Sequence, residues 1–235
     1  MPDDPSRFYA SAPMQALFAR ELGALAPILS GIYGNYGLFL RAHAATPAAL
    51  PPNLLGTMIQ LAATPSGRLD GSLSCASAQL PFVSESFKLL IAQHAFEQID
   101  NVQECAAELA RVLAPEGVAL ILGFNPLGSW RPWLALRAPR GEPRLRLRSA
   151  QSWQQLLACE HVDTLQVRYP GVLWPRGGIA PAESRIASAF ARIGSSWLLL
   201  ARKRRSTLTP LRLRFAPREL ALSPRLAPST HRACT

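Results

Sequence analysis

Side chains that could take part in catalysis gather at the end of one apolar segment. Residues 87–93 form a nearly continuous apolar run, typical of a strand buried on both faces of a sheet. The run ends in Gln93 and His94, and Glu97 follows. Because an imidazole titrates at about pH 6.5, His94 is a candidate general base, with packing as the alternative. Gln93 is a candidate ligand contact, and Glu97 is expected to be a capping or surface residue.

The elements that would position these residues follow directly along the chain. Asn101, with Glu104 three residues later, is typical of a helix start, and apolar spacing predicts a helix over residues 102–113. Residues 114–117, Ala-Pro-Glu-Gly, should end it, and residues 118–124 form a second buried strand. Strand, helix and strand predict a parallel βαβ unit with a right-handed crossover.

The expected ligand site lies at one edge of this sheet. Open α/β sheets bind ligands beyond the carboxyl ends of their strands. In this chain those ends are Gln93-His94 and residues 123–125. We therefore expect any active or binding site there.

The rest of the chain shows weaker periodicities. A helix is expected from Met14 to Ile32, kinked or split by Pro27, followed by a glycine-rich turn over residues 31–37. Further elements are expected at 38–42, 58–62, 165–169 and 196–201 as strands and at 150–159 and 182–193 as helices.

Charge is distributed unevenly along the 235 residues. The net charge is +10, yet residues 1–130 carry −4 and residues 131–235 carry +14, of which +8 lies in residues 202–235. Such a tail could contact nucleic acid non-specifically, although no recognition module accompanies it. A protein-docking arm, or a by-product of base composition, are the alternatives, since only two of the 25 basic residues are lysines.

The composition also argues against several classes of protein. No apolar run approaches the roughly 18 residues of a membrane span, and the N-terminus lacks an apolar signal region. The four cysteines lie far apart without zinc or disulfide spacing, so no metal site is expected. We expect a cytoplasmic protein with a flexible leader (1–12), a folded domain (13–204) and a basic, disordered tail (205–235).

Several motifs in order resemble a known family. Residues 80–82 read Leu-Pro-Phe, residues 86–97 read Ser-Phe-Lys-Leu-Leu-Ile-Ala-Gln-His-Ala-Phe-Glu, and residues 109–117 read Leu-Ala-Arg-Val-Leu-Ala-Pro-Glu-Gly. This pattern resembles the class I AdoMet-dependent methyltransferases of the small-molecule type often labelled type 11. Residues 123–126 and 197–204 further resemble a small bacterial methyltransferase-like group.

The resemblance implies a fold and a cofactor. The fold is an α/β three-layer sandwich, Rossmann-like, around a seven-stranded, mostly parallel sheet whose last strand is antiparallel. S-adenosyl-L-methionine (AdoMet) would lie across the carboxyl ends of its strands. Carried over by motif position, the cofactor-binding candidates are Leu40, Arg41, His43, Ala76, Gln79, Leu80 and Gln93, with His94 as the catalytic candidate.

The chain departs from the family pattern where the cofactor would be held. The loop after the first strand should carry glycines that let the backbone approach the cofactor, and residues 38–44 contain none. No acid for the ribose hydroxyls follows the second strand near Ala62, and Ala76 replaces the usual acid near the adenine.

Three hypotheses about function follow. The first is AdoMet-dependent methyl transfer to an unknown acceptor, expected to be a small molecule. The second is a catalytically inactive methyltransferase-fold protein with a binding or regulatory role. The third is a methyltransferase that holds RNA or DNA through the basic tail.

Overall fold

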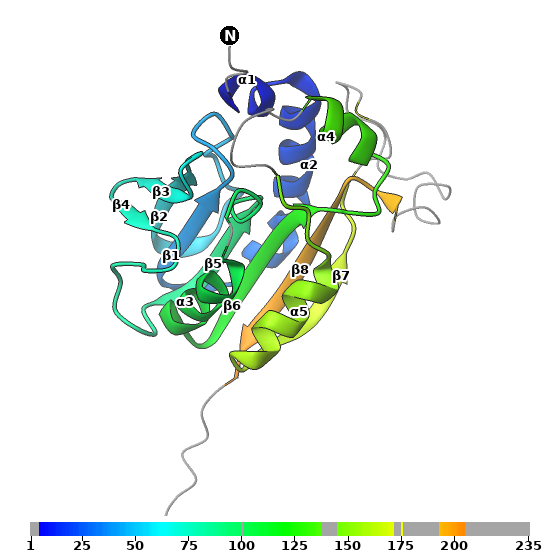
Figure 1. The fold of residues 1–235 in the computed structure, drawn as a ribbon. Coiled ribbons are helices and arrows are strands. Elements are labelled where there is room, and N and C mark those ends of the chain that lie inside the picture. Colours follow the sequence, from blue (N-terminus) through cyan, green and yellow to red (C-terminus); the bar gives the residue numbers. More distant parts are fainter. Residues whose placement is uncertain (1–4, 100, 138–144, 172–174, 176–192, 205–235) are drawn as a thin grey trace, which may run out of the picture. The chain divides into compact units, whose positions relative to one another are not determined.

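A computed structural model describes residues 5–99, 101–137, 145–171, 175 and 193–204. At its centre is an eight-stranded sheet in the order β4-β3-β2-β1-β5-β6-β8-β7 (Figure 1). The strands are β1 (Tyr33–Arg41), β2 (Leu54–Ala63), β3 (Arg68–Gly71), β4 (Ser74–Ala76), β5 (Phe87–Gln93), β6 (Leu113–Phe124), β7 (Val162–Arg168) and β8 (Ser196–Lys203). The helices are α1 (Pro5–Tyr9), α2 (Ala12–Leu29), α3 (Val102–Val112), α4 (Arg131–Arg137) and α5 (Ala150–Cys159).

The middle of the sheet is parallel, and its borders are antiparallel. The strands β2, β1, β5 and β6 pair in parallel, whereas β3 is antiparallel to β2 and β8 is antiparallel to β6. The predicted α/β fold with an antiparallel last strand is confirmed. The sheet has eight strands rather than seven because the short β3–β4 hairpin forms one border.

Helices cover both faces of the sheet, which confirms the three layers (Figure 1). On one face, leucines of α2 pack against Phe39 of β1, Leu89 of β5 and Leu120 of β6. On the other face, α3 and α5 bury residues such as Cys105 and Trp153 against the same strands. The predicted βαβ unit is β5–α3–β6, and Asn101 caps α3 by accepting a hydrogen bond from the Glu104 backbone.

The first strand begins earlier than the sequence predicted. Residues 33–37, expected to belong to a glycine-rich turn, form the first half of β1. Gly34 allows this because β1 lies close to β5: a Cβ at Gly34 would lie 2.7 Å from Cβ of Lys88. The glycine therefore permits close packing, which a sequence pattern cannot distinguish from a turn.

The link from β1 to β2 contains no helix. Residues 42–53 return to the start of β2 as an irregular segment. Leu50 packs against the α2 face, and Gln60 of β2 donates a hydrogen bond to the Ala48 carbonyl at 3.2 Å. A crossover between parallel strands is usually an α-helix, so this segment is an unusual connection.

Three other expectations need correction. Pro27 does not split α2, because it lies only two residues before the last helical residue, Leu29. Residues 114–117 belong to β6, and a register shift opposite Phe87, with Glu116 at φ 57°, absorbs the expected turn. The leader expected at residues 1–12 contains α1, in which Tyr9 is fully buried.

Two further sequence predictions lie outside the described residues: the helix at 182–193, except for its last residue, and the tail at 205–235.

The loop that carries the family-like Leu-Pro-Phe motif is fixed by α3. Arg111 donates hydrogen bonds to the carbonyls of Leu80 and Phe82, at 3.0 and 2.9 Å. Glu108 accepts one from the Leu80 backbone at 2.9 Å and pairs with Arg111. This segment of the motif therefore has a structural role.

Substituting alanine for two glycines should change the stability of the fold in opposite directions. Gly23 lies in α2 with open space around a Cβ, so Gly23→Ala should stabilise the fold by about 1 kcal/mol. At Gly123 a Cβ would lie 2.5 Å from the indole of Trp197, so Gly123→Ala should destabilise by about 1–3 kcal/mol. Urea unfolding of both variants measures this; equal effects would contradict the packing of β6 against Trp197.

Candidate functional site

The candidate site begins where β5 ends. His94, directly after Gln93, has a left-handed backbone with φ 51°, which is uncommon for a residue other than glycine. Its backbone N–H donates to the Leu122 carbonyl at 3.0 Å, so the turn stays attached to β6. Unusual backbone of this kind is concentrated at functional sites.

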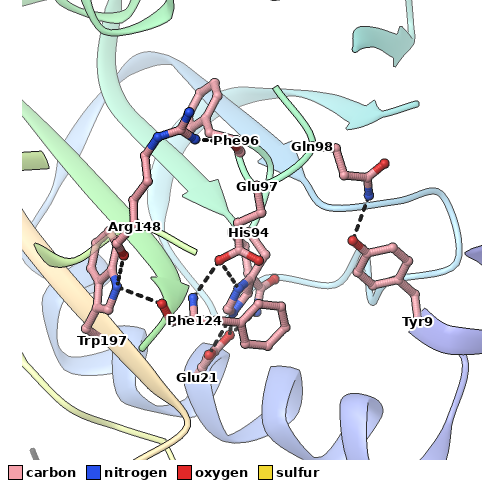
Figure 2. Close-up of polar contacts among 10 residues, drawn as sticks. Tyr9, Glu21, His94, Phe96, Glu97, Gln98, Phe124, Arg148 and Trp197 are labelled. Atoms are coloured by element: carbon pink, nitrogen blue, oxygen red, sulfur yellow. Dashed lines mark hydrogen bonds and ion pairs between the residues drawn. The ribbon is translucent and has the colours of Figure 1, made fainter. Parts of the chain in front are cut away.

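The imidazole of His94 lies between two carboxylates (Figure 2). Its Nε2 is 3.0 Å from Oε1 of Glu21, on α2, and its Nδ1 is 3.1 Å from Oε1 of Glu97. Glu21 also accepts a hydrogen bond from Nε2 of Gln93 at 2.9 Å, and Glu97 accepts one from the Phe124 backbone at 2.5 Å. The cluster of Glu21, His94 and Glu97, called the His94 cluster below, thus joins α2, β5 and β6.

Burial and charge together set the protonation of the His94 cluster. Its three side chains are buried, with His94 only 1% exposed. Burial alone would lower the pKa of His94, but the charges and hydrogen bonds of Glu21 and Glu97 outweigh it and raise the pKa to about 10. The ring is therefore an imidazolium at neutral pH, and each ring nitrogen donates to a carboxylate.

This protonation state bears on the predicted role of His94. An imidazolium that donates from both nitrogens has no free lone pair with which to accept a proton. The catalytic assignment stays a prediction, and the arrangement gives His94 another role, as a charged cross-link between α2 and the end of β5.

Aromatic side chains of the N-terminal helices cover the cluster. The ring of Phe18 on α2 lies 5.6 Å from that of His94, and Phe124 lies 4.1 Å away. Tyr9 of α1 accepts a hydrogen bond from Nε2 of Gln98 at 2.6 Å (Figure 2). The pKa of Tyr9 is raised, mainly by burial, so its hydroxyl stays neutral.

Arg148 fixes the loop that carries Glu97. Its guanidinium donates to the Phe96 carbonyl at 3.1 Å, and its own carbonyl accepts from the Trp197 indole at 2.9 Å (Figure 2). The guanidinium also donates to the Ile99 carbonyl at 3.2 Å. A small cavity lies beside these contacts of Arg148. It is lined by Phe96, Glu97, Ile121, Leu122, Gly123, Arg146, Arg148, Trp153 and Trp197.

The structure brings some predicted site residues together. Arg41 and Gln93 are register partners at the ends of β1 and β5, and His94 follows Gln93. His43, just beyond β1, stacks on Tyr9, with ring centroids 5.4 Å apart. These four residues lie at the carboxyl edge of the sheet.

The other candidates lie elsewhere. Leu40 and Leu80 are buried in the core on the α3 face. Ala76 ends β4, and Gln79 forms an isolated bridge with it. Whether any of these residues contacts a cofactor stays a prediction.

Sequence reasoning missed Glu21 and Tyr9. Glu21 stands on the apolar stripe of α2, between Phe18 and Leu25. An acid on the buried face of a helix is a recognisable signal, since buried charges require partners. No comparable signal marked Tyr9, because α1 is too short to show a periodicity.

Buried polar atoms without a hydrogen-bond partner also mark this edge. Six such side-chain atoms occur among the described residues. Three lie at or just beyond the carboxyl ends of β1 and β5, namely Arg41 Nε, Gln93 Oε1 and Glu97 Oε2, and the others are Trp130 Nε1, Thr164 Oγ1 and Ser196 Oγ. Buried polar groups are normally paired, and exceptions indicate an unseen water, ion or functional contact.

The described part of the chain shows neither a cluster of metal ligands nor a helix suited to span a membrane. No group of three or more His, Cys, Asp or Glu side chains there is arranged to hold a metal ion. No helix there is long and apolar enough to cross a membrane.

Removing Glu21 should strongly destabilise the protein. Glu21→Ala leaves the buried His94 cation with one carboxylate and Gln93 without its acceptor, at a cost of about 3–5 kcal/mol. The exposed Glu104→Ala is the matched control and should change stability far less. Chemical denaturation measures both, and a Glu21→Ala loss no larger than the control's would show that the cluster is not charged.

The raised pKa of His94 predicts a pH dependence. Because the pKa rises from 6.5 to about 10 on folding, the contribution of His94 is complete below pH 6.5 and is lost as pH rises towards 10. The stability of the wild type should therefore fall relative to His94→Gln across this window. Parallel urea titrations at several pH values measure the difference, and identical pH profiles would contradict a folded-state imidazolium.

Comparisons with known proteins show a matching domain and a shared fold. Residues 50–121 match the family model of the methyltransferase domain. A search of curated proteins finds no match. The fold resembles the methyltransferase solved in complex with the Trm112 activator of Haloferax volcanii, at TM-score 0.60 and 14% identity, covering 87% of this chain and 98% of that one.

Two further solved structures share the fold. A SAM-dependent methyltransferase of Thermotoga maritima has TM-score 0.54 and 11% identity, with 84% of this chain and 94% of that one covered. A [4+2]-cyclase has TM-score 0.50 and 14% identity, with 79% and 80% covered. AdoMet is the cofactor of the family and methyl transfer its reaction, with the acceptor open. Both the matched domain and the fold agree with the motifs of residues 80–117: residues 50–121 match the methyltransferase domain family, and the chain has the methyltransferase fold.

Proposed function

We propose that this protein with the methyltransferase fold acts as a binding or regulatory protein that does not hold AdoMet at the carboxyl edge of its sheet. The proposal rests on one observation. The side chains at the ends of β1, β5 and β6 are covered by buried residues of α1 and α2, joined to them through the His94 cluster.

The loop after β1 does not fit the cofactor. In the resembling family, glycines in this loop leave room for the backbone to approach AdoMet. In this chain β1 ends at Arg41, and the loop continues with Ala42 and His43. The ring of His43 stacks on Tyr9, and no helix begins after the loop. A helix N-terminus with free N–H groups, which would favour a carboxylate or phosphate, is absent from residues 42–53.

The space at the carboxyl end of β5 leaves no room for AdoMet either. Phe18, Glu21 and Phe124 surround His94, and all four residues are at most 1% exposed. A ligand there would have to displace side chains that are paired by charge and by hydrogen bonds. Breaking one partner from such a buried pair costs about 3–5 kcal/mol, or two to four decades of affinity.

Methyl transfer to a small-molecule acceptor is the second candidate, and one observation favours it. Asp70 on β3 is the register partner of Ala62 at the end of β2, next to the position of the missing ribose-binding acid. Its carboxylate accepts a hydrogen bond from Ser74 and is exposed. Asp70 would supply the acid from a neighbouring strand, provided that the N-terminal helices moved away.

Two finer predictions remain proposals. Non-specific contact with nucleic acid would use the basic tail, whose residues lie outside the described part of the chain. A cytoplasmic location fits the sequence. The structurally similar Haloferax volcanii protein was solved in complex with a methyltransferase activator, so a partner protein is a second candidate contact, and pull-down with and without the tail would separate it from nucleic acid.

Calorimetric titration with AdoMet, and with its demethylated product, decides between the two candidates. We expect no heat and no thermal stabilisation at ligand concentrations up to about 1 mM. The Thermotoga methyltransferase, measured in parallel, serves as the positive control. Micromolar binding to this chain would overturn the proposal and favour methyl transfer, and loss of that binding in Asp70→Asn would then identify the ribose contact.

A further inference from the structure

Helix α4 is packed on one side and exposed on the other. Leu134, only 3% exposed, belongs to the apolar cluster that α4 forms with α1 and α2 (Figure 1). The ring centroid of Trp133 lies 5.8 Å from that of Phe8 on α1. These two contacts fix the orientation of α4, so its outer side is a defined surface.

The outer side of α4 is apolar. Pro132, Ala135 and Leu136 are exposed, and their spacing puts them on one side of the helix. Leu127 lies in the preceding turn, where its backbone N–H donates to Oδ1 of Asn125 at 3.1 Å, and its side chain is 81% exposed. The four residues Leu127, Pro132, Ala135 and Leu136 are called the α4 surface below. Grouped apolar side chains, unlike single exposed ones, mark interaction sites.

Arginines flank the α4 surface. Arg131 begins α4 and Arg137 ends it, and both are exposed. None of the ion pairs formed among the described residues includes either of them. Residues 117–137 and 145–159 contain no aspartate or glutamate. The surface therefore combines exposed apolar groups with positive charge.

A lipid surface fits this combination better than a nucleic acid does. Apolar side chains beside arginines are typical of segments that lie in the interface of anionic membranes. Proteins that hold single strands stack the bases on aromatic rings, whereas Trp130 is 1% exposed and Trp133 is half-buried. The leucines of the α4 surface gain from insertion among acyl chains, and a nucleic acid offers them no comparable partner.

We propose that the α4 surface binds peripherally to anionic lipid membranes. Leu127 and Leu136 enter the boundary between headgroups and acyl chains, while Arg131 and Arg137 pair with lipid phosphates. This contact requires no membrane-spanning helix. It goes beyond the proposed function and does not depend on it, because neither AdoMet nor the His94 cluster takes part.

Co-sedimentation of the full chain with lipid vesicles tests the proposal. We expect the wild type to bind vesicles of phosphatidylcholine mixed with phosphatidylglycerol, and to bind phosphatidylcholine alone far more weakly. The double variant Leu127→Ser/Leu136→Ser should bind the anionic vesicles about tenfold more weakly than the wild type. Val83→Ser/Leu165→Ser is the matched control: it removes two exposed apolar side chains elsewhere, keeps the basic tail, and should bind as the wild type does.

A second pair of variants tests the arginines. Arg131→Gln/Arg137→Gln should weaken binding to the anionic vesicles more than Arg68→Gln/Arg202→Gln, which removes the same charge from exposed positions elsewhere. Circular dichroism shows whether each variant is folded.

Three results would overturn the proposal: no binding of the wild type to the anionic vesicles, equal binding to neutral vesicles, or a leucine variant that binds as tightly as its control. If the leucine variant loses affinity for double-stranded DNA but not for the vesicles, the α4 surface binds nucleic acid instead. If it dissociates a dimer and leaves vesicle binding unchanged, the surface is a contact between two copies of the chain.

Discussion

The buried contact of Glu21, His94 and Glu97 is the interaction on which the carboxyl edge depends. It connects the first long helix to the ends of two central strands, although about seventy residues separate Glu21 from His94 in the chain. A buried ion pair often adds little net stability compared with apolar packing, because desolvation offsets attraction. We infer that it contributes specificity, because the one buried acid of α2 meets the imidazolium at this position.

The irregular connection after β1 belongs to the same arrangement. Where the family has a glycine loop and a helix, residues 42–53 turn back without one, and His43 packs under Tyr9. Side chains of α1 and α2 thereby cover the edge. Arg41 and Gln93 each have a buried polar atom without a hydrogen-bond partner, so this edge retains unused hydrogen-bonding groups. The fold is retained, and the chemistry of its edge differs from the family pattern.

Local sequence patterns made part of the fold and of the candidate site predictable. The β5–α3–β6 unit follows from short apolar runs and a capped amphipathic helix, and Gln93 and His94 could be placed at its edge. The first half of β1 was missed, because Gly34 serves close strand packing rather than a turn. The β3–β4 hairpin is too short to give a period. The pairing of Glu21 with His94 was not predicted because it depends on tertiary structure, although an acid within an apolar stripe pointed to a buried partner.

The most direct test is the protonation of His94 itself. Nitrogen-15 chemical shifts of the imidazole, measured by NMR at about pH 8, distinguish an imidazolium from either neutral tautomer. Both ring nitrogens of His94 are expected to carry protons at this pH. A neutral His94 with one unprotonated nitrogen would contradict it, because α2 would then be held by an ordinary hydrogen bond.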